Sequence, residues 1–574
     1  MNPPTPATPA IVSQAAVRRL PRLALILFCA AYVLPGFLGR EPWKDADVTA
    51  FGVMLEMAAG RSSWWQPQLL GLAVDESGPL PYWLGAVAIE LLPFFSSHLA
   101  ARIPFALLLA LTLACTWYAV YHLARQPAAQ PVSFAFGGEA RPADYARALA
   151  DAGLLALLAC LGLAQLAHET TPDLVRLSLV ALMLYAAARL AHQTERQPVH
   201  ALAAWGLAAL GLTLSGGIWL SAVLGSGLLG AIWLARRRPR HQAIEVNPTP
   251  PDLLYWSAGV LLLVVASAIG AGLAALPQPR IDFSPEHWLR WARLLLWFSW
   301  PAWPLVLWTL WRWRRQLLEP HLALPLWVAL VGVALSALSN ERDRALLLAL
   351  PALAALAAFA LPTLRRSMAA LIDWFTLVFF TACAFIIWVI WLAIQTGVPA
   401  RPAANVARLA PNFVHEFSWL LFVPAALASA AWLGLVAWRM WRHRDQIWKS
   451  LVLPAAGSTL CWLLLMTLWL PLLDFGLSYG PAVRRIAALV PPQSCVLVKG
   501  LSPAQIAALQ YHGGLDLRRS KGSAATPCLT LVLAPAQRDM LVQRSDYRQW
   551  TYVSTVGRRN DDRERLLVYR RASD

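Results

Sequence analysis

The sequence predicts a polytopic α-helical membrane protein with about thirteen transmembrane helices, followed by a small C-terminal α/β domain. Three observations predict this class. Hydrophobic residues make up 58% of the 574 residues and charged residues only 14%, whereas soluble domains carry roughly 25% charged residues. Apolar runs of about 17–25 residues, each long enough to cross a bilayer, recur along most of the chain. Short arginine clusters separate these runs, which is typical of cytoplasmic loops.

The first apolar run follows a basic segment. Residues 1–19 are rich in Pro, Ala and Thr, which predicts a disordered cytoplasmic N-terminus. Arg18, Arg19 and Arg22 then indicate that the chain enters the membrane from the cytoplasm. We expect a transmembrane catalytic domain over 20–474, with spans at 20–38, 101–124, 147–166, 172–192, 200–214, 216–235, 253–276, 293–311, 323–339, 345–361, 372–397, 418–438 and 450–473.

Two segments allow other interpretations. Residues 39–100 are predicted to form a long first loop on the outer side, and its apolar stretch 80–95 is placed as a helix at the membrane interface rather than as a span. The runs 200–214 and 216–235 are short, and Ser-Gly-Gly at 215–217 separates them. They could also form a hairpin that does not cross fully, or one long broken helix.

Residues 475–574 have the pattern of a small α/β domain, predicted to lie in the periplasm because an odd number of spans precedes it. Strands are predicted at 495–500, 515–519, 528–533, 550–554 and 566–569, with a helix at 502–512 that begins at the N-cap Ser502. Cys495 and Cys528 each begin a strand, so neighbouring strands could bring them within bonding distance. A disulfide between them is expected if the compartment is oxidising.

Several function classes find little support. The net charge of +17 comes largely from arginine clusters between apolar runs, and no basic surface interleaved with aromatic residues predicts nucleic-acid binding. The sequence contains no GxGxxG or Walker motif. If the protein transfers a chemical group, this absence favours a lipid carrier for that group over a nucleotide carrier. The sequence also lacks CxxC and Cys/His metal spacings.

The first candidate site residues lie in the first loop, in the run Pro-Trp-Lys-Asp-Ala-Asp at 42–47. Carboxylates are scarce in so apolar a chain, and ionisable groups at a membrane boundary are functional candidates. Asp47, or Asp45 in its place, can act as a general base that takes a proton from an acceptor hydroxyl. The alternative is a solvated loop acid or a cap for the helix that begins near residue 48.

Two further residues suggest a metal site. Glu76 precedes Gly-Pro at 78–79 and is a candidate ligand for a divalent cation, Zn²⁺ or Mg²⁺/Mn²⁺, or a further substrate-binding acid. His287 could complete that site. The alternatives are a helix cap for Glu76 and a surface position for His287.

Short outer loops hold the remaining candidates. His168, Glu169 and Asp173 occur within six residues between two spans. His168 and Glu169 are candidates for substrate binding, and Asp173 is a candidate catalytic residue unless it only caps the next helix. Arg290 and Arg293 are candidates for holding a phosphate, a task that suits the guanidinium fork, although Glu286 and Arg290 are also spaced to pair along a helix. Arg344 is a third phosphate candidate, with ion pairing inside 340–344 as the alternative.

At these positions the chain resembles the ArnT-like group of family 39 glycosyltransferases, relatives of the protein O-mannosyltransferases with the GT-C fold. The family's Pro-Trp-Lys-Pro-Asp-Glu is matched by the run at 42–47, and its Glu-Lys-Pro-Pro-Leu-Tyr-Tyr-Trp by Glu-Ser-Gly-Pro-Leu-Pro-Tyr-Trp at 76–83. Its Ala-Ala-Arg-Leu-Pro is matched at 100–104 and its Thr-Pro-Asp at 171–173. The tail resembles the family's outer α/β domain, including its two cysteines.

The resemblance implies about thirteen spans, a polyprenyl-phosphate sugar donor and an inverting attack, with an acid at the Asp-Glu position as base. It further implies a bacterial inner membrane location and transfer of 4-amino-4-deoxy-L-arabinose or another sugar to lipid A or a similar periplasmic acceptor. The sequence departs from the family in three places. Ala46-Asp47 replaces the Asp-Glu pair, Ser77 replaces a phosphate-binding Lys, and Arg344 stands near a family Tyr.

We therefore expect a glycosyltransferase whose partners are a polyprenyl-phosphate-linked donor, a periplasmic acceptor and membrane lipids, without nucleic acid. One alternative is an enzyme that transfers the sugar to protein, as the O-mannosyltransferases do. The other is a lipid or sugar transporter that uses the same acids as a relay, but no internal repeat of the kind found in many transporters is evident.

Overall fold

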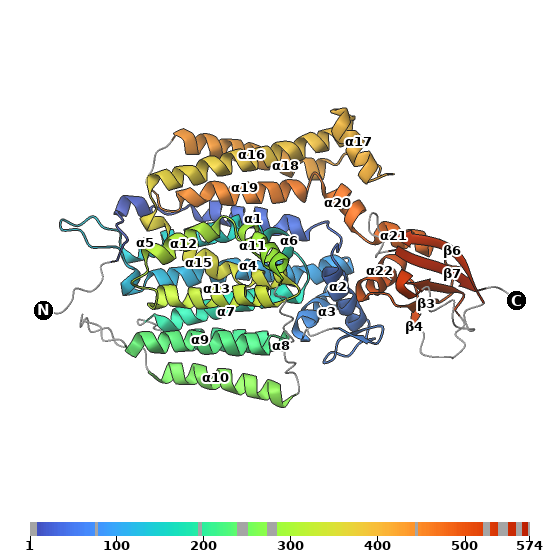
Figure 1. The fold of residues 1–574 in the computed structure, drawn as a ribbon, viewed down its shortest axis with the longest axis horizontal. Coiled ribbons are helices and arrows are strands. Elements are labelled where there is room, and N and C mark those ends of the chain that lie inside the picture. The colour runs from blue at the N-terminus through green and yellow to red at the C-terminus, as the bar shows by residue number, and fades with distance from the viewer. Residues whose placement is uncertain are drawn as a thin grey trace.

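The computed structural model describes residues 8–74, 78–192, 198–237, 251–271, 284–411, 413–441, 446–519, 528–537, 549–557 and 565–571. Long helices lie side by side in one bundle, with the N-terminus at one end and the C-terminal domain at the other (Figure 1). We call these the amino-terminal end and the domain end. The bundle helices are α1 (Arg22–Phe37), α4 (Ser97–Ala124), α5 (Pro142–Ala159), α7 (Pro172–Ala191), α8 (Pro198–Leu214), α9 (Ile218–Arg237), α10 (Pro251–Gly270), α12 (Ala302–Arg312), α13 (Pro320–Leu338), α15 (Leu350–Ala358), α16 (Arg366–Thr396), α18 (Trp419–Trp441) and α19 (Lys449–Leu465).

The chain is a multi-pass helical membrane protein. Within the described ranges, eight helices are long and apolar enough to cross a membrane, and ten if each bent helix pair counts as one span. In the part of the chain that the structure describes, each predicted span falls on one helix or on consecutive helices. The helices over the first and fifth predicted spans, α1 and α8, have only 16 and 17 residues. Helix length and hydropathy therefore give eight to ten candidate spans among the described residues, and the number of about thirteen stays a prediction.

The predicted span 293–311 is not a single helix. It is divided between α11 (Pro285–Phe298) and α12, which are bent by 91° relative to each other. Pro301 lies at the break, and a proline cannot donate the backbone hydrogen bond that would continue α11. A second bend of 66° separates α19 from α20 (Leu470–Leu477).

Small residues dominate the centre of the bundle, where α4, α5, α7 and α15 pack together. All nine residues of α15, six of them alanine or proline, are buried, and small side chains let membrane helices approach closely. The peripheral helices differ, because only 11% of the apolar window of α18 is buried within the protein. These helices therefore present their apolar side chains to lipid.

The expected disorder of residues 1–19 does not hold for the part that the structure describes. A 3₁₀ helix, η1 (Gln14–Val17), lies at the amino-terminal end, and Ala10, Val12 and Val17 are buried. Ser13 forms an antiparallel bridge with Glu139. Apolar side chains at alternate positions anchor the segment, a signal that its Pro- and Ala-rich composition concealed.

The first loop forms a compact layer at the domain end. It contains α2 (Asp45–Ala58), the short hairpin of β1 (Gln68–Leu69) and β2 (Leu72–Ala73), and α3 (Leu80–Leu91). With 12 residues, α3 is about 18 Å long, too short to span a hydrocarbon core of about 30 Å. The helix α3 therefore agrees with the prediction of a helix that does not cross the membrane.

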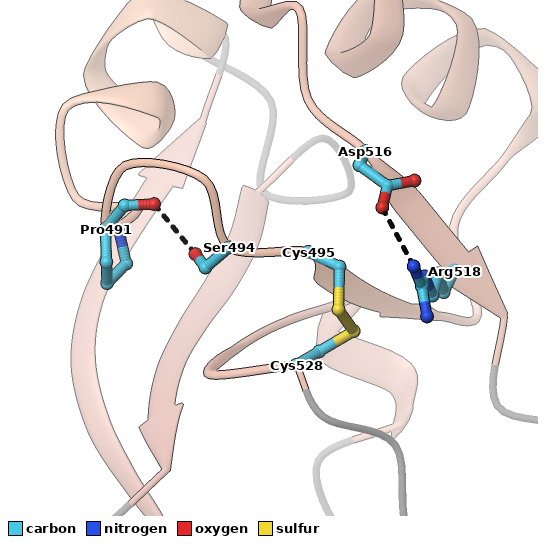
Figure 2. Close-up of a disulfide and its surroundings, with 6 residues drawn as sticks. All are labelled: Pro491, Ser494, Cys495, Asp516, Arg518 and Cys528. Atoms are coloured by element: carbon cyan, nitrogen blue, oxygen red, sulfur yellow. Dashed lines mark hydrogen bonds and ion pairs between the residues drawn. A yellow bond between two sulfur atoms is a disulfide. The ribbon is translucent and has the colours of Figure 1, made fainter.

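The C-terminal domain has the predicted strands and helix. A five-stranded sheet has the order β4-β3-β5-β7-β6, with parallel pairing of β3 (Val496–Lys499) to β4 (Leu517–Arg519) and β5 (Thr530–Leu533). β7 (Arg565–Arg571) pairs antiparallel with β5 and β6 (Trp550–Gly557). Helix α22 (Pro503–Gly513) begins with a capping box at Ser502. A disulfide joins Cys495 to Cys528, the pair singled out in the sequence (Figure 2).

Shorter elements complete the described fold. They are η2 (Pro127–Ala129), α6 (Leu163–Leu166), α14 (Arg342–Leu347), η3 (Leu361–Thr363), α17 (Ala400–Leu409), α21 (Gly480–Ala487) and η4 (Pro535–Gln537). Of these, α6 and α14 flank the candidate site.

Candidate functional site

Asp47 lies in the first turn of α2 and is completely buried. Its Oδ1 accepts hydrogen bonds from the backbone N–H (2.8 Å) and the hydroxyl (2.5 Å) of Thr170. Its Oδ2 accepts a longer bond of 3.3 Å from Nη2 of Arg40. The N-cap of α2 is Lys44, so Asp47 is not the cap that the alternative interpretation required. Because Oδ2 has only one long hydrogen bond, this oxygen retains capacity to accept a further hydrogen bond.

Two buried arginines lie beside Asp47. Arg40 donates to the backbone carbonyl of His168 at 2.6 Å and lies 4.9 Å from the ring centre of Trp43. Arg102 donates to the backbone carbonyl of Arg40. Nε and Nη1 of Arg40 and Nη2 of Arg102 have no hydrogen-bond partner among the described residues. Two buried guanidinium groups therefore lie near the buried carboxylate of Asp47, and the charges of Glu169 and Asp474 also act on them.

Sequence analysis did not select Arg40 as a site residue and used Arg102 only as part of a motif. A signal was present for both. Arg40 follows the first apolar span directly, and Arg102 lies inside the apolar run of α4. Charged residues in such positions are functional candidates by the same reasoning that selected Asp47.

Arg344 connects two acidic residues from another part of the chain. Its Nη2 donates to Oε2 of Glu169 at 2.7 Å, and its Nη1 donates to Oδ2 of Asp173 at 3.0 Å. The pairing inside 340–344 is weaker, because Glu341 lies 3.7 Å from Nε of Arg344. Burial raises the pKa of Glu169, although the neighbouring Arg344 opposes this shift.

The loop between α6 and α7 joins these two groups. Glu169 contacts Arg344, and the next residue, Thr170, binds Asp47. We call Arg40, Asp47, Glu169, Asp173 and Arg344 the outer cluster. Its members come from the first loop, α2, the α6–α7 connection, α7 and α14, so the structure brings together three of the carboxylates that the sequence predicted separately.

His168 and Asp45 have different surroundings. His168 is fully buried between the rings of Tyr32, Phe37 and Trp462. Its two ring nitrogens face the backbone carbonyls of Ala164 and Tyr32, and burial lowers its pKa to about 3. Its contacts are those of a packing residue. Asp45 lies at the exposed start of α2, where the hydroxyl of Tyr479 donates to it at 2.8 Å.

Arg290 and Arg293 lie on the exposed face of α11, outside the outer cluster. Nε of Arg290 is 3.3 Å from the backbone carbonyl of Glu286, so the predicted side-chain pair of Glu286 and Arg290 is replaced by a bond to the helix backbone. Helix α11 packs on α14, which carries Arg344. Among the described residues, no hydrogen bond or ion pair joins either arginine to the cluster.

Of the predicted metal site, only His287 belongs to the residues that the structure describes. Glu76 lies outside the described ranges. Nη2 of Arg342 lies 2.7 Å from Nδ1 of His287, and a guanidinium can only donate, so that nitrogen serves as its acceptor. The described residues also contain no group of three His, Cys, Asp or Glu side chains placed to hold a metal. A cation next to the histidine would repel a second one.

Gly78 nevertheless shows where the first loop returns to the bundle. A Cβ atom on Gly78 would lie 2.1 Å from the backbone oxygen of Leu214, so only glycine fits against the α8–α9 turn. In the same turn, the carbonyl of Ser215 accepts two bonds from Arg176, which lies 3.7 Å from Asp173. The loop that carries the motif at 76–83 thus ends beside the outer cluster.

The fold and site define a multi-pass membrane protein with a buried charged cluster at one end of its helical bundle, next to a small α/β domain. This is the fold of ArnT, a GT-C protein. The crystal structure of ArnT from Cupriavidus metallidurans in the apo state matches with a TM-score of 0.62 and 17% identity, covering 96% of this chain and 98% of that one. The structure of the same protein bound to undecaprenyl phosphate matches with a TM-score of 0.61, the same identity and the same coverage.

A weaker match is the oligosaccharyltransferase of Archaeoglobus fulgidus tethered to an acceptor peptide. It has a TM-score of 0.43 and 10% identity, and covers 94% of this chain and 74% of that one; no argument below depends on it. No protein-family model matches the chain, and no curated protein matches its sequence.

Proposed function

We propose that the protein is a membrane glycosyltransferase that moves a sugar from a polyprenyl-phosphate carrier to an acceptor at the outer face of a bacterial inner membrane. Lipid A is the first acceptor that we would test. The observation that carries the proposal is the outer cluster, a buried carboxylate with arginines on both sides of the α6–α7 loop, in a fold shared with ArnT over 96% of the chain. One ArnT structure holds undecaprenyl phosphate.

In the proposed reaction, Asp47 accepts the proton of an acceptor hydroxyl at Oδ2. The hydroxyl oxygen forms a bond to the anomeric carbon of the donor sugar while the bond from that carbon to the phosphate oxygen breaks. The electron pair leaves with the polyprenyl phosphate. Arg40 and Arg344 of the outer cluster would stabilise this charge, and Arg290 and Arg293 on α11 remain candidates for holding the phosphate. Preorganised cations of this kind commonly supply much of the rate enhancement.

Glu169 and Asp173 have a positioning role in this scheme. Both hold Arg344, and Glu169 lies directly before the residue that binds Asp47. The residues present do not fit a metal beside His287, so no step uses one. His168 is left out of the proposed site because its nitrogens face backbone carbonyls.

Two observations support a periplasmic domain end. The disulfide between Cys495 and Cys528 lies there, and disulfides persist in oxidising compartments. Basic residues gather at the opposite end, where Arg19 pairs with Asp144 and where the last turn of α9 carries Arg236 and Arg237. Such an excess is typical of the cytoplasmic side.

The test compares Asp47→Asn with Asp45→Asn in proteoliposomes supplied with polyprenyl-phosphate sugars and lipid A. General-base catalysis contributes about 10²–10⁴-fold to a rate, so we expect Asp47→Asn to lower kcat by about 100-fold or more. Asp45→Asn should stay within about threefold of the wild type, because its carboxylate is exposed. Mass spectrometry of lipid A gives the readout.

Equal amounts of folded protein in the membrane are required for this comparison. Full activity of Asp47→Asn would remove Asp47 as the base. If no sugar-sized mass shift occurs with lipid A, protein or other lipid acceptors for the wild type, the proposed function itself fails.

A further inference from the structure

The C-terminal domain reaches the helix that carries Asp47. Helix α22 packs on α2 with almost no side-chain layer between them. A Cβ atom on Gly52 would lie 2.4 Å from the Cβ and 3.3 Å from the Cα of Ala507. Real Cβ atoms do not approach that closely, so Gly52 permits this helix crossing and a methyl group there would separate the two helices.

Specific contacts surround this crossing point. The rings of Phe51 and Tyr511 meet edge to face at 4.9 Å between centroids. Nε2 of Gln510 donates to Oε1 of the buried Glu56 at 3.3 Å. The hydroxyl of Tyr511 lies 3.0 Å from Nδ1 of His98, at the start of α4. The domain therefore holds α2 through one face of α22 and contacts the bundle through the same helix.

The other end of α2 depends on short hydrogen bonds. Asp47 is five residues before Gly52, less than one and a half helical turns. Its bonds to Thr170 are 2.5 and 2.8 Å long. A shift of α2 by a few tenths of an ångström would lengthen those bonds, because hydrogen-bond strength falls steeply with poor geometry. The position of Asp47 therefore depends on what α2 packs against.

We propose that α22 is a positioning element for the reaction: its contact with Gly52 sets where Asp47 lies relative to Thr170 and Arg40. Gly52 and Ala507 are thus positioning residues, since neither contacts Asp47. This inference depends on the proposed function for its kinetic readout. A second readout, amide exchange at Thr170, does not require any activity.

The experiment uses the full-length protein with Gly52→Ala, Ala507→Gly and the double variant. Gly52→Ala adds a methyl group at the crossing, and Ala507→Gly removes the methyl group that it would meet. We expect Gly52→Ala to lower kcat about tenfold with an unchanged KM for the donor, and to speed hydrogen–deuterium exchange of the 168–171 segment. The double variant should restore both to within about twofold.

Gly85→Ala is the matched control. Its Cβ would press on Met54 of α2 from α3, with the sulfur 2.2 Å away, but a methionine side chain adapts readily. We expect kcat and exchange within about twofold of the wild type. If Gly52→Ala does not accumulate, Ala507→Gly alone should lower kcat about threefold and speed exchange, because it loosens the same contact.

Three results would overturn the proposal. The first is that Gly52→Ala retains the wild-type kcat and exchange rate. The second is that the double variant does not recover them. The third is that Gly85→Ala lowers kcat as much as Gly52→Ala does. If no variant and no wild-type preparation transfers a sugar, the proposed function fails, while the exchange data still decide whether α22 sets the position of Asp47.

Discussion

The two ends of the bundle use charged residues in different ways. At the domain end, the outer cluster draws five side chains from separate segments, and Arg40, Asp47 and Glu169 are fully buried. At the amino-terminal end, Arg439 of α18 pairs with Asp373 of α16, with side chains 23% and 15% exposed, and Arg19 pairs with Asp144 at the surface. At the domain end, charged side chains from several segments converge on one cluster, whereas at the amino-terminal end they form separate ion pairs.

The energetic cost explains why this difference matters. Removing an ion from water costs several kcal/mol even after relaxation. A protein therefore keeps four buried ionic groups and the partly exposed Asp173 in one place only if they are paired or take part in a reaction. Two ion pairs at the edge of a bundle cost much less, because water or headgroups reach them. We therefore infer that the charged residues at the domain end serve the reaction and that those at the amino-terminal end serve membrane topology. The following variants test this difference.

The largest effect is expected at Arg344. Arg344→Gln removes the cation that faces Glu169 and Asp173 and leaves Glu169 buried without its ion-pair partner. Breaking such a pair costs about 3–5 kcal/mol, and loss of a preorganised cation should lower kcat by about 100-fold or more. Thermal unfolding in detergent and the transfer assay measure the two effects.

The double variant Glu169→Gln with Arg344→Gln separates stability from chemistry. Two neutral amides can hydrogen-bond to each other, so most of the lost stability should return while transfer stays low. If activity returns together with stability, the outer cluster has only a structural role. The charged residues at the two ends of the bundle would then not differ in function.

Much of the fold followed from sequence, because hydropathy and strand patterns are local signals. The strands and the helix of the C-terminal domain were predicted, as was a non-spanning helix at 80–95, which the structure has at 80–91. The acidic residues at 47, 169 and 173 were selected as site candidates, and their role stays a prediction. The break between α11 and α12 was missed because hydropathy does not change there, although Pro301 marks it. The ordered segment at 8–19 was missed because its anchors are single buried side chains.

The site was only partly predictable. Sequence analysis selected acids and exposed arginines one loop at a time, since each loop carries its own signal. Which arginine meets which carboxylate depends on how helices far apart in sequence pack. Arg344 was selected as a phosphate ligand, but its pairing with Glu169 and Asp173 was not predicted. Arg40 was not selected, because a basic residue at the end of a span resembles a topology signal.

A smaller effect is expected at the amino-terminal end. Asp373→Asn or Arg439→Gln removes a partly exposed ion pair, and such pairs are worth roughly 1 kcal/mol or less. We expect a small loss of thermal stability and a transfer rate within about twofold of the wild type. A loss of turnover comparable to that of Arg344→Gln would show that charges at this end also serve the reaction, which would break the comparison.

The smallest effect concerns His512, at the contact between the C-terminal domain and the first loop. Its Nε2 lies 4.0 Å from Oε2 of Glu41, and the charges of Arg484 and His98 also act on this group of residues. Burial lowers the pKa of His512 below its usual 6.5, with Glu41 opposing the shift. The folded state therefore binds the proton of His512 less readily than the unfolded state does.

The sign of the pH dependence follows from this shift. Stability from the neutral His512 is fully present above about pH 6.5, and it is lost progressively as the pH falls towards the lower pKa of the folded state, because the unfolded chain then binds more protons. We expect the protection factors of the α22 amides, which correct for the pH dependence of intrinsic exchange, to fall modestly between pH 7 and pH 5, and His512→Gln to flatten that change. An unchanged slope in His512→Gln would mean that other groups control the docking of the domain. Arg439→Gln should leave the slope intact, because the Asp373–Arg439 pair lies at the opposite end of the bundle.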